Sequence, residues 1–134
     1  MWRILIADDD PAAQKILVNI LKGKAECTVT KDGLEALNAY RDAKKRGAGF
    51  DAIVLDVQMP EMDGVTVLRL IRDEEEQANV IFGQGIPIIV LTVYDEYFTK
   101  MFNLKCDDFL VKPVVADVLL KKLSEKIDSR KPIG

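Results

Sequence analysis

The sequence predicts an α/β fold in which a doubly wound parallel sheet is covered by helices on both faces. Three observations predict it: five short apolar runs, amphipathic segments between them, and two runs so continuously apolar that both faces of each strand are expected to be covered. Strand and helix alternating five times is typical of a parallel sheet. The 134 residues suit one domain, residues 1–128, followed by a polar tail at 129–134.

The apolar runs are the expected strands, and residues between them mark where helices begin. We expect strands at residues 3–7, 27–30, 52–55, 86–91 and 108–111. Asp10 before Pro11 predicts the N-cap and first turn of a helix, because aspartate accepts from free backbone N–H groups and proline fits the first position. Asp63 before Gly64 is a second candidate cap. Apolar residues at helical spacing predict the first and last helices: Ala13, Ile16, Leu17, Ile20 and Leu21, then Leu119, Leu123 and Ile127.

One connection is long and irregular. The stretch "RDEEEQANVIFGQG", residues 72–85, is first acidic, then apolar, and then contains glycine. A run of charges is usually a solvated surface, so we expect its acidic part to be the exposed end of a helix.

Composition excludes several classes of function. The formal net charge is −3 and no basic block stands out before the tail, so we expect no direct binding of nucleic acid. The run "IPIIVLTV" is too short to cross a membrane, and the start of the chain does not resemble a signal peptide, which favours the cytoplasm. Cys27 and Cys106 are expected to be small buried hydrophobes. With no histidine in the chain, zinc sites and Ser-His or Cys-His nucleophiles are not expected.

Polar side chains follow four of the five expected strands. Asp8 and Asp9 follow the first strand, Asp56 the third, Thr92 the fourth and Lys112 the fifth. In an open parallel sheet, ligands bind beyond the carboxyl ends of the strands. If the strands are parallel, these side chains lie along one edge.

Three neighbouring carboxylates need a cation. Two unit charges about 4 Å apart repel by roughly 4 kcal/mol at an effective dielectric constant of ~20. Oxygen ligands with positions left for water suit Mg²⁺, or alternatively Mn²⁺. Aspartate can also accept a phosphoryl group as an acyl phosphate, and a metal and a lysine neutralise the charge that develops. Asp56, alone at the end of a central strand, is the best acceptor candidate.

Four stretches carry a family resemblance: "ILIADDDP", "AIVLDVQMPEMDG", "IPIIVLT" and "DDFLVKP". In order and spacing they resemble the receiver domain of two-component response regulators, over nearly the whole chain. The resemblance implies a flavodoxin-like (βα)5 fold with strand order 2-1-3-4-5.

The resemblance also implies a role for each matching residue. Asp56 matches the phosphoacceptor, and Thr92 and Lys112 match the residues that contact the phosphoryl group. Phe109 and Thr92 stand at the family's switch positions, although Phe109 in plain core packing is an equal alternative. The implied ligands of Mg²⁺ are Asp8, Asp9, Asp56 and the backbone carbonyl of Gln58.

The implied activity is a phosphorylation-activated signalling switch, not an enzyme acting on other substrates. The implied donor is a sensor histidine kinase or phosphotransfer protein, and the output is a downstream protein target. The resemblance also allows a phosphorylation-dependent homodimer. Two features stand out against the family: the connection before "IPIIVLT" is longer than usual, and a bulky Tyr94 is expected to shield the acyl phosphate and prolong its lifetime.

Two alternatives come from other classes of protein. The first is a Mg²⁺-dependent phosphatase acting through an aspartyl phosphate. Such enzymes favour a second aspartate two residues after the nucleophile, where this chain has Gln58. The second is a nucleotide or flavin binder, which usually has a Gly-rich or Ser/Thr-rich loop after the first strand. The sequence "DDDPA" repels phosphate unless a metal intervenes.

Overall fold

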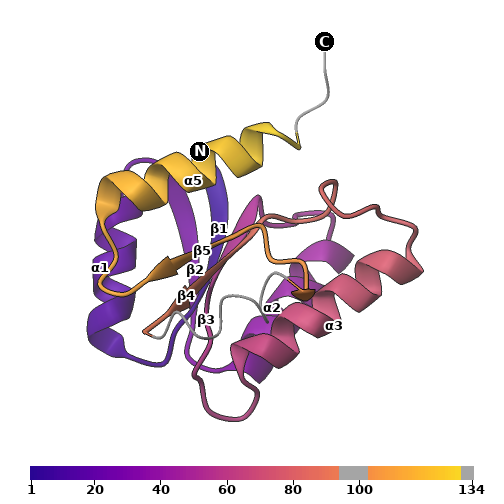
Figure 1. Ribbon diagram of the computed structural model, residues 1–134, viewed down its shortest axis with the longest axis horizontal. Helices are drawn as coiled ribbons and strands as arrows, with labels where there is room; N and C mark the ends of the chain where they lie inside the picture. Colours follow the sequence, from indigo (N-terminus) through magenta and orange to yellow (C-terminus); the bar gives the residue numbers. More distant parts are fainter. Residues whose placement is uncertain (94–102, 131–134) are drawn as a thin grey trace.

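Five strands and four helices build the part of the chain that the computed structural model describes, residues 1–93 and 103–130. The strands are β1 (Trp2–Ala7), β2 (Ala25–Thr30), β3 (Ala52–Asp56), β4 (Ile88–Thr92) and β5 (Asp108–Val111). The helices are α1 (Pro11–Leu21), α2 (Gly33–Lys45), α3 (Gly64–Gln77) and α5 (Ala116–Asp128) (Figure 1). All five expected strands are present, and β2 begins two residues earlier than expected because Ala25 and Glu26 also pair with β1.

The sheet is parallel throughout and its strands lie in the order β2-β1-β3-β4-β5. This confirms the flavodoxin-like 2-1-3-4-5 order that the resemblance implied. The register aligns the ends of the strands: Ala7 pairs with Leu55, Asp56 with Leu91, and Thr92 with Val111. The residues that end or follow these strands therefore share one edge of the sheet.

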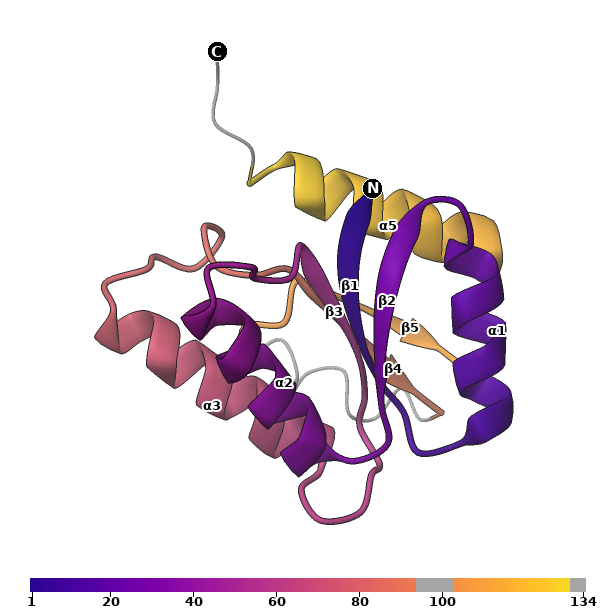
Figure 2. The same ribbon diagram turned by 180° about the vertical axis from the view of Figure 1, so that it is seen from behind.

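Helices cover both faces of the sheet. Helices α1 and α5 lie on one face and α2 and α3 on the other (Figure 1, Figure 2). Each face has its own apolar core, because alternate strand residues point to opposite faces. In β1, Leu5 packs with the α2 and α3 side chains, while Ile4 and Ile6 pack with those of α1 and α5. All of β3 and β4 is buried, as the continuous apolar runs predicted.

Both expected helix caps are confirmed. Asp10 accepts from the Ala12 backbone N–H (3.1 Å) and Asp63 accepts from that of Thr66 (2.8 Å). A third cap was not expected: Asp32 accepts from the Glu35 N–H (2.8 Å) and begins α2. Each cap satisfies a backbone donor that the first turn of the helix leaves without a partner.

The two cysteines differ in burial. Cys106 is buried and packs in the core shared with α2 and α3, as expected, whereas Cys27 is only half-buried on the edge strand β2. Burial raises the pKa of both thiols, that of Cys106 to about 11. Neither thiol is therefore activated as a nucleophile.

The acidic stretch after residue 71 is not simply solvated, so that expectation is wrong at two positions. Arg72 and Glu75 are buried, and Arg72 Nη1 lies 2.6 Å from Glu75 Oε1. Arg72 Nη2 also contacts Asp107 Oδ2 at 2.8 Å, just before β5. The helical repeat explains the error: positions 72 and 75 share the buried face with Ile71, while Asp73 and Glu76 point to solvent.

Adjacent glutamates allow a matched test of this burial. Glu75→Gln removes the charge from a buried pair, and we expect it to lower the free energy of unfolding by about 1–3 kcal/mol. The exposed neighbour, changed by Glu76→Gln, should stay within about 0.5 kcal/mol of wild type. Urea titration of both variants measures the difference, and equal losses would contradict the assigned burial.

Candidate metal centre at the carboxyl edge of the sheet

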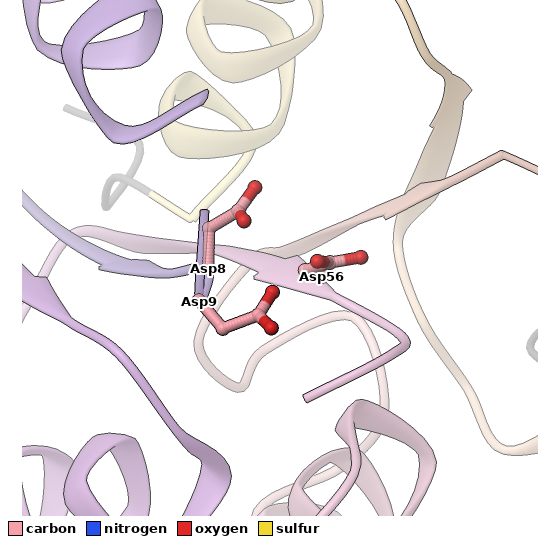
Figure 3. A group of neighbouring side chains, drawn as sticks. All are labelled: Asp8, Asp9 and Asp56. Carbon is pink, nitrogen blue, oxygen red and sulfur yellow. The ribbon is translucent and has the colours of Figure 1, made fainter. Parts of the chain in front are cut away.

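Three carboxylates converge where β1 and β3 end. Asp8 and Asp9 directly follow β1, and Asp56 is the last residue of β3. One oxygen from each lies within 4.8 Å of the other two, and Figure 3 shows the three side chains gathered around a common space. Asp8 is fully buried and Asp56 is 6% exposed, whereas Asp9 is exposed. The sequence-based expectation that these three acids meet at one edge is confirmed.

Several contacts fix Asp8 in place. Its Oδ1 accepts from the Asp10 backbone N–H (3.0 Å), and its backbone carbonyl accepts from Gln14 Nε2 (2.6 Å). Its other carboxylate oxygen accepts from Lys112 Nζ (3.0 Å). Gln14 was missed by the sequence analysis, because an amide one turn into a helix gives no signal of what it contacts.

Lys112 links the far strand to the carboxylates. Its Nζ lies 3.0 Å from Asp8 Oδ2 and 3.3 Å from Asp56 Oδ2, and its backbone N–H donates to the Thr92 carbonyl (2.8 Å). Burial alone would lower the pKa of Lys112, but hydrogen bonds and the charges of Asp8 and Asp56 outweigh it, so the pKa is raised. The amine is therefore a permanent cation beside two buried acids.

Asp56 has an unusual affinity for protons. Burial raises its pKa to about 6, with Lys112 acting to lower it and the Asp8 charge acting to raise it. A backbone hydrogen bond from Gln58 N–H (3.4 Å) opposes the shift weakly. Near neutral pH the side chain is a desolvated carboxylate, which is the form that can act as a nucleophile.

Gly64 lets the loop after β3 fold back over this edge. A Cβ at position 64 would lie 2.1 Å from the Asp56 carbonyl oxygen, and the Gly64 N–H donates to the Val57 carbonyl (2.8 Å). No other residue type fits there without displacing the backbone of Asp56 and Val57. In the sequence, Gly64 indicates only the start of a helix, so this close approach was not predicted.

The other expected site residues lie at or near the same edge. Thr92 is buried at the end of β4, and exposed Gln58 lies two residues after Asp56. Phe109, in β5, is half-buried against the core of the α2–α3 face and pairs with Val90, two positions before Thr92. Tyr94, expected to shield an acyl phosphate, falls outside the described residues.

The acidic cluster fits a small divalent cation. Mg²⁺ holds oxygen ligands at about 2.1 Å, so opposite ligands lie about 4.2 Å apart. The observed spread of 4.8 Å needs only a small inward rotation of the side chains. With all three acids ionised, the carboxylates and Lys112 carry two net negative charges, which one dication neutralises. The donors are hard oxygens, as Mg²⁺ and Mn²⁺ prefer.

Comparison with known sequences agrees with this geometry. The response regulator receiver domain family matches residues 4–124. Response regulator MprA of Mycobacterium avium is 33% identical over 133 residues, covering 97% of this chain and 53% of that protein. DNA-binding response regulator MtrA of Mycolicibacterium smegmatis is 29% identical over 128 residues, covering 93% of this chain and 50% of that protein. The chain spans about half the length of these two relatives.

Solved structures are similar over the whole fold. The Francisella response regulator 1452 receiver domain is 29% identical, with a TM-score of 0.79 and coverage of 98% of this chain and 100% of that one. The receiver domain of sensor histidine kinase PA1611 from Pseudomonas aeruginosa, solved with magnesium in its active-site cleft, is 25% identical (TM-score 0.78; 95% and 98% covered). A chain in the co-crystal of the Saccharomyces cerevisiae phosphotransfer protein Ypd1 with the receiver domain of Ssk1 is 30% identical (TM-score 0.82; 98% and 92% covered).

The helices give no sign of a membrane span. Within residues 1–93 and 103–130, each helix is too short or too polar to cross a bilayer.

Magnesium affinity should depend on pH through Asp56. Because the pKa of Asp56 is raised to about 6, protons compete with the metal below that pH. We expect the apparent affinity for Mg²⁺ to rise about tenfold per pH unit up to about pH 6 and then level off, with a proton released on binding. Isothermal titration calorimetry in buffers of different ionisation enthalpy measures both effects. Asp56→Asn should bind more weakly and lose the pH dependence; a flat profile for wild type would contradict the assigned shift.

Proposed function

Because this chain belongs to the response regulator receiver domain family, we propose that Asp56 is the residue on which its switch is phosphorylated. The chain is a phosphorylation-activated signalling module that uses Mg²⁺, rather than an enzyme acting on other substrates. The phosphatase alternative is therefore not retained. The observation that supports Asp56 is its place: a buried carboxylate at the end of a central strand, beside two further acids and a lysine.

The proposed reaction is transfer of a phosphoryl group from a donor phosphohistidine. An Asp56 carboxylate oxygen forms a bond to phosphorus while the donor's P–N bond breaks, and the electron pair of that bond stays on the imidazole nitrogen. The metal supplies charge neutralisation for the phosphoryl oxygens. Hydrolysis of the acyl phosphate later restores the carboxylate and resets the switch.

The surrounding residues take distinct parts in this proposal. Asp8, Asp9, Asp56 and the backbone carbonyl of Gln58 would hold the Mg²⁺. Lys112, now 3.3 Å from Asp56 Oδ2, pairs with a phosphoryl oxygen, and the Thr92 hydroxyl donates to another. Both contacts form only when Asp56 is phosphorylated, so they bias the domain toward a second state, with Phe109 as the proposed switch residue.

Substitution of the acceptor gives the direct test. Wild-type protein incubated with Mg²⁺ and acetyl phosphate should gain the mass of one phosphoryl group in intact-protein mass spectrometry. We expect Asp56→Asn to gain none, because its amide is not a nucleophile. Asp10→Asn is the matched control, since Asp10 is a neighbouring exposed acid whose side chain caps α1 and whose backbone contact with Asp8 is kept. Undiminished labelling of Asp56→Asn would overturn the assignment.

The proposed donor is a sensor histidine kinase or a phosphotransfer protein. A cleft of about 360 Å³ runs from Asp8 and Lys112 along α1 to Val114 in the β5–α5 connection. Ile16, 53% exposed, lies in this cleft and offers an apolar contact next to the reacting carboxylate. A donor seated here brings its phosphohistidine to Asp56. The similar Ssk1 receiver domain was crystallised with a histidine phosphotransfer protein.

Two phosphodonors separate docking from chemistry. Ile16→Ser should slow phosphorylation by a protein donor at least about fivefold, because an exposed apolar contact is lost. It should leave phosphorylation by acetyl phosphate unchanged. Leu34→Ser, at an exposed position on the opposite face, should affect neither rate. Equal slowing with both donors would place the effect of Ile16 in the reaction, not in docking.

We also propose how the phosphorylated chain passes on its signal and in which compartment it acts. The phosphorylated form would act on a downstream protein target, with phosphorylation-dependent homodimerisation as one route. We place the chain in the cytoplasm, where both cysteines, which are free in the structure, stay reduced.

A further inference from the structure

A loop after α3 exposes two large apolar side chains. Ile81 is 75% exposed and its neighbour Phe82 is 51% exposed. The loop lies at the end of the sheet where the strands begin, opposite the carboxylates (Figure 1). Isolated exposed apolar residues are common on proteins. Here the pair is adjacent, and the loop that bears it is unusually well anchored.

Glu75 anchors the loop from both sides. Its backbone carbonyl accepts from the Val80 N–H (2.8 Å), and its Oε2 accepts from the Ile86 N–H (2.7 Å). The Gln84 N–H closes a turn on the Ile81 carbonyl (2.9 Å), with Gly83 in the left-handed region at φ +97°. These bonds hold Ile81 and Phe82 at the tip of a defined turn.

The guanidinium of Arg72 contacts the aromatic ring of Phe82. Its guanidinium carbon lies 5.8 Å from the centre of the Phe82 ring, within the range of a cation–π contact. Arg72 is itself fixed by Glu75, Asp107 and the carbonyl of Lys105. The exposed ring is therefore preorganised, and little conformational entropy remains to be lost when it is covered.

Charged residues of both signs lie beside Phe82. Arg69, Asp73 and Glu76 line a single cleft of about 160 Å³ together with Phe82. All three are exposed and lie on one stripe of α3, with the cation first and the carboxylates one and two turns later. When two such helices lie antiparallel, Arg69 of each faces Glu76 of the other. Arg69 and Glu76 are thus complementary across a twofold axis, and Asp73 lies close to that axis.

We propose that this surface, the 69–82 patch (Arg69, Asp73, Glu76, Ile81 and Phe82), binds a second copy of the chain in a symmetric dimer. The Ile81 and Phe82 side chains of the two copies pack together at the axis, and the Arg69–Glu76 pairs flank them. This dimer is independent of Asp56 and of phosphorylation. The patch is small, so we expect a dissociation constant between about 1 µM and about 1 mM.

Sedimentation velocity over a concentration series tests the proposal without any phosphodonor. Wild type and Asp56→Asn should both shift from monomer to dimer as the concentration rises. Phe82→Ser should weaken the dimer at least about tenfold, because the central contact is lost. Leu34→Ser, which changes an exposed leucine elsewhere, is the matched control and should dimerise as wild type does.

Charge reversal tests the antiparallel geometry. Arg69→Glu and Glu76→Arg should each disrupt the dimer by placing like charges together, and the double variant should restore it. Arg46→Glu, which breaks an exposed ion pair between the C-cap of α2 and Asp42, should have no effect. Thermal melting confirms that each variant is folded; apart from Asp56, all the changed side chains are exposed. A wild type that stays monomeric throughout, or a dimer insensitive to Phe82→Ser and to both reversals, would overturn the proposal.

Discussion

Two carboxylates with almost no solvent access lie side by side at the edge of the sheet, and their repulsion constrains everything around them. Neighbouring strands hold both residues there, because the Asp8 N–H donates to the Thr30 carbonyl of β2 and Asp56 pairs with Leu91 of β4. Lys112 offsets part of the repulsion, but the cluster retains an excess of negative charge. Burial raises the pKa of Asp56 to about 6, Lys112 opposes this rise, and the charge of Asp8 adds to it. Repulsion between the carboxylates thus destabilises the site, and a bound divalent cation would remove that repulsion.

The fold produces this arrangement through strand order and register. Pairing β1 with the central strand β3 puts residues more than forty positions apart in sequence within reach of one ion. Lys112 reaches the same point because β5 ends level with β4. Gly64 admits the returning loop without displacing Asp56. At the opposite end of the sheet, Arg72 forms ion pairs with Glu75 and Asp107. The loop that bears Phe82 is therefore anchored by contacts that do not involve the metal centre.

The features that follow from local pattern were predictable, and those that depend on distant partners were not. The apolar runs predicted the strands, and Asp10 and Asp63 predicted helix caps. Aspartates directly after strands predicted the carboxylate cluster, once the strands were assumed to be parallel. Strand order itself came only from the family resemblance. Arg72 and Glu75 were assigned to solvent because their sequence neighbours are charged, and the partner Asp107 lies 35 residues from Arg72. The pKa shift of Asp56 depends on burial, which composition does not reveal.

A crystal of this chain grown with Mn²⁺ would show the metal centre itself, because Mn²⁺ accepts the same oxygen ligands as Mg²⁺ and scatters anomalously. We expect one anomalous peak between Asp8, Asp9 and Asp56, about 2.2 Å from an oxygen of each, with the Gln58 carbonyl beside it. A peak that contacts only one of these carboxylates, or three side chains turned apart with manganese bound elsewhere, would contradict this expectation.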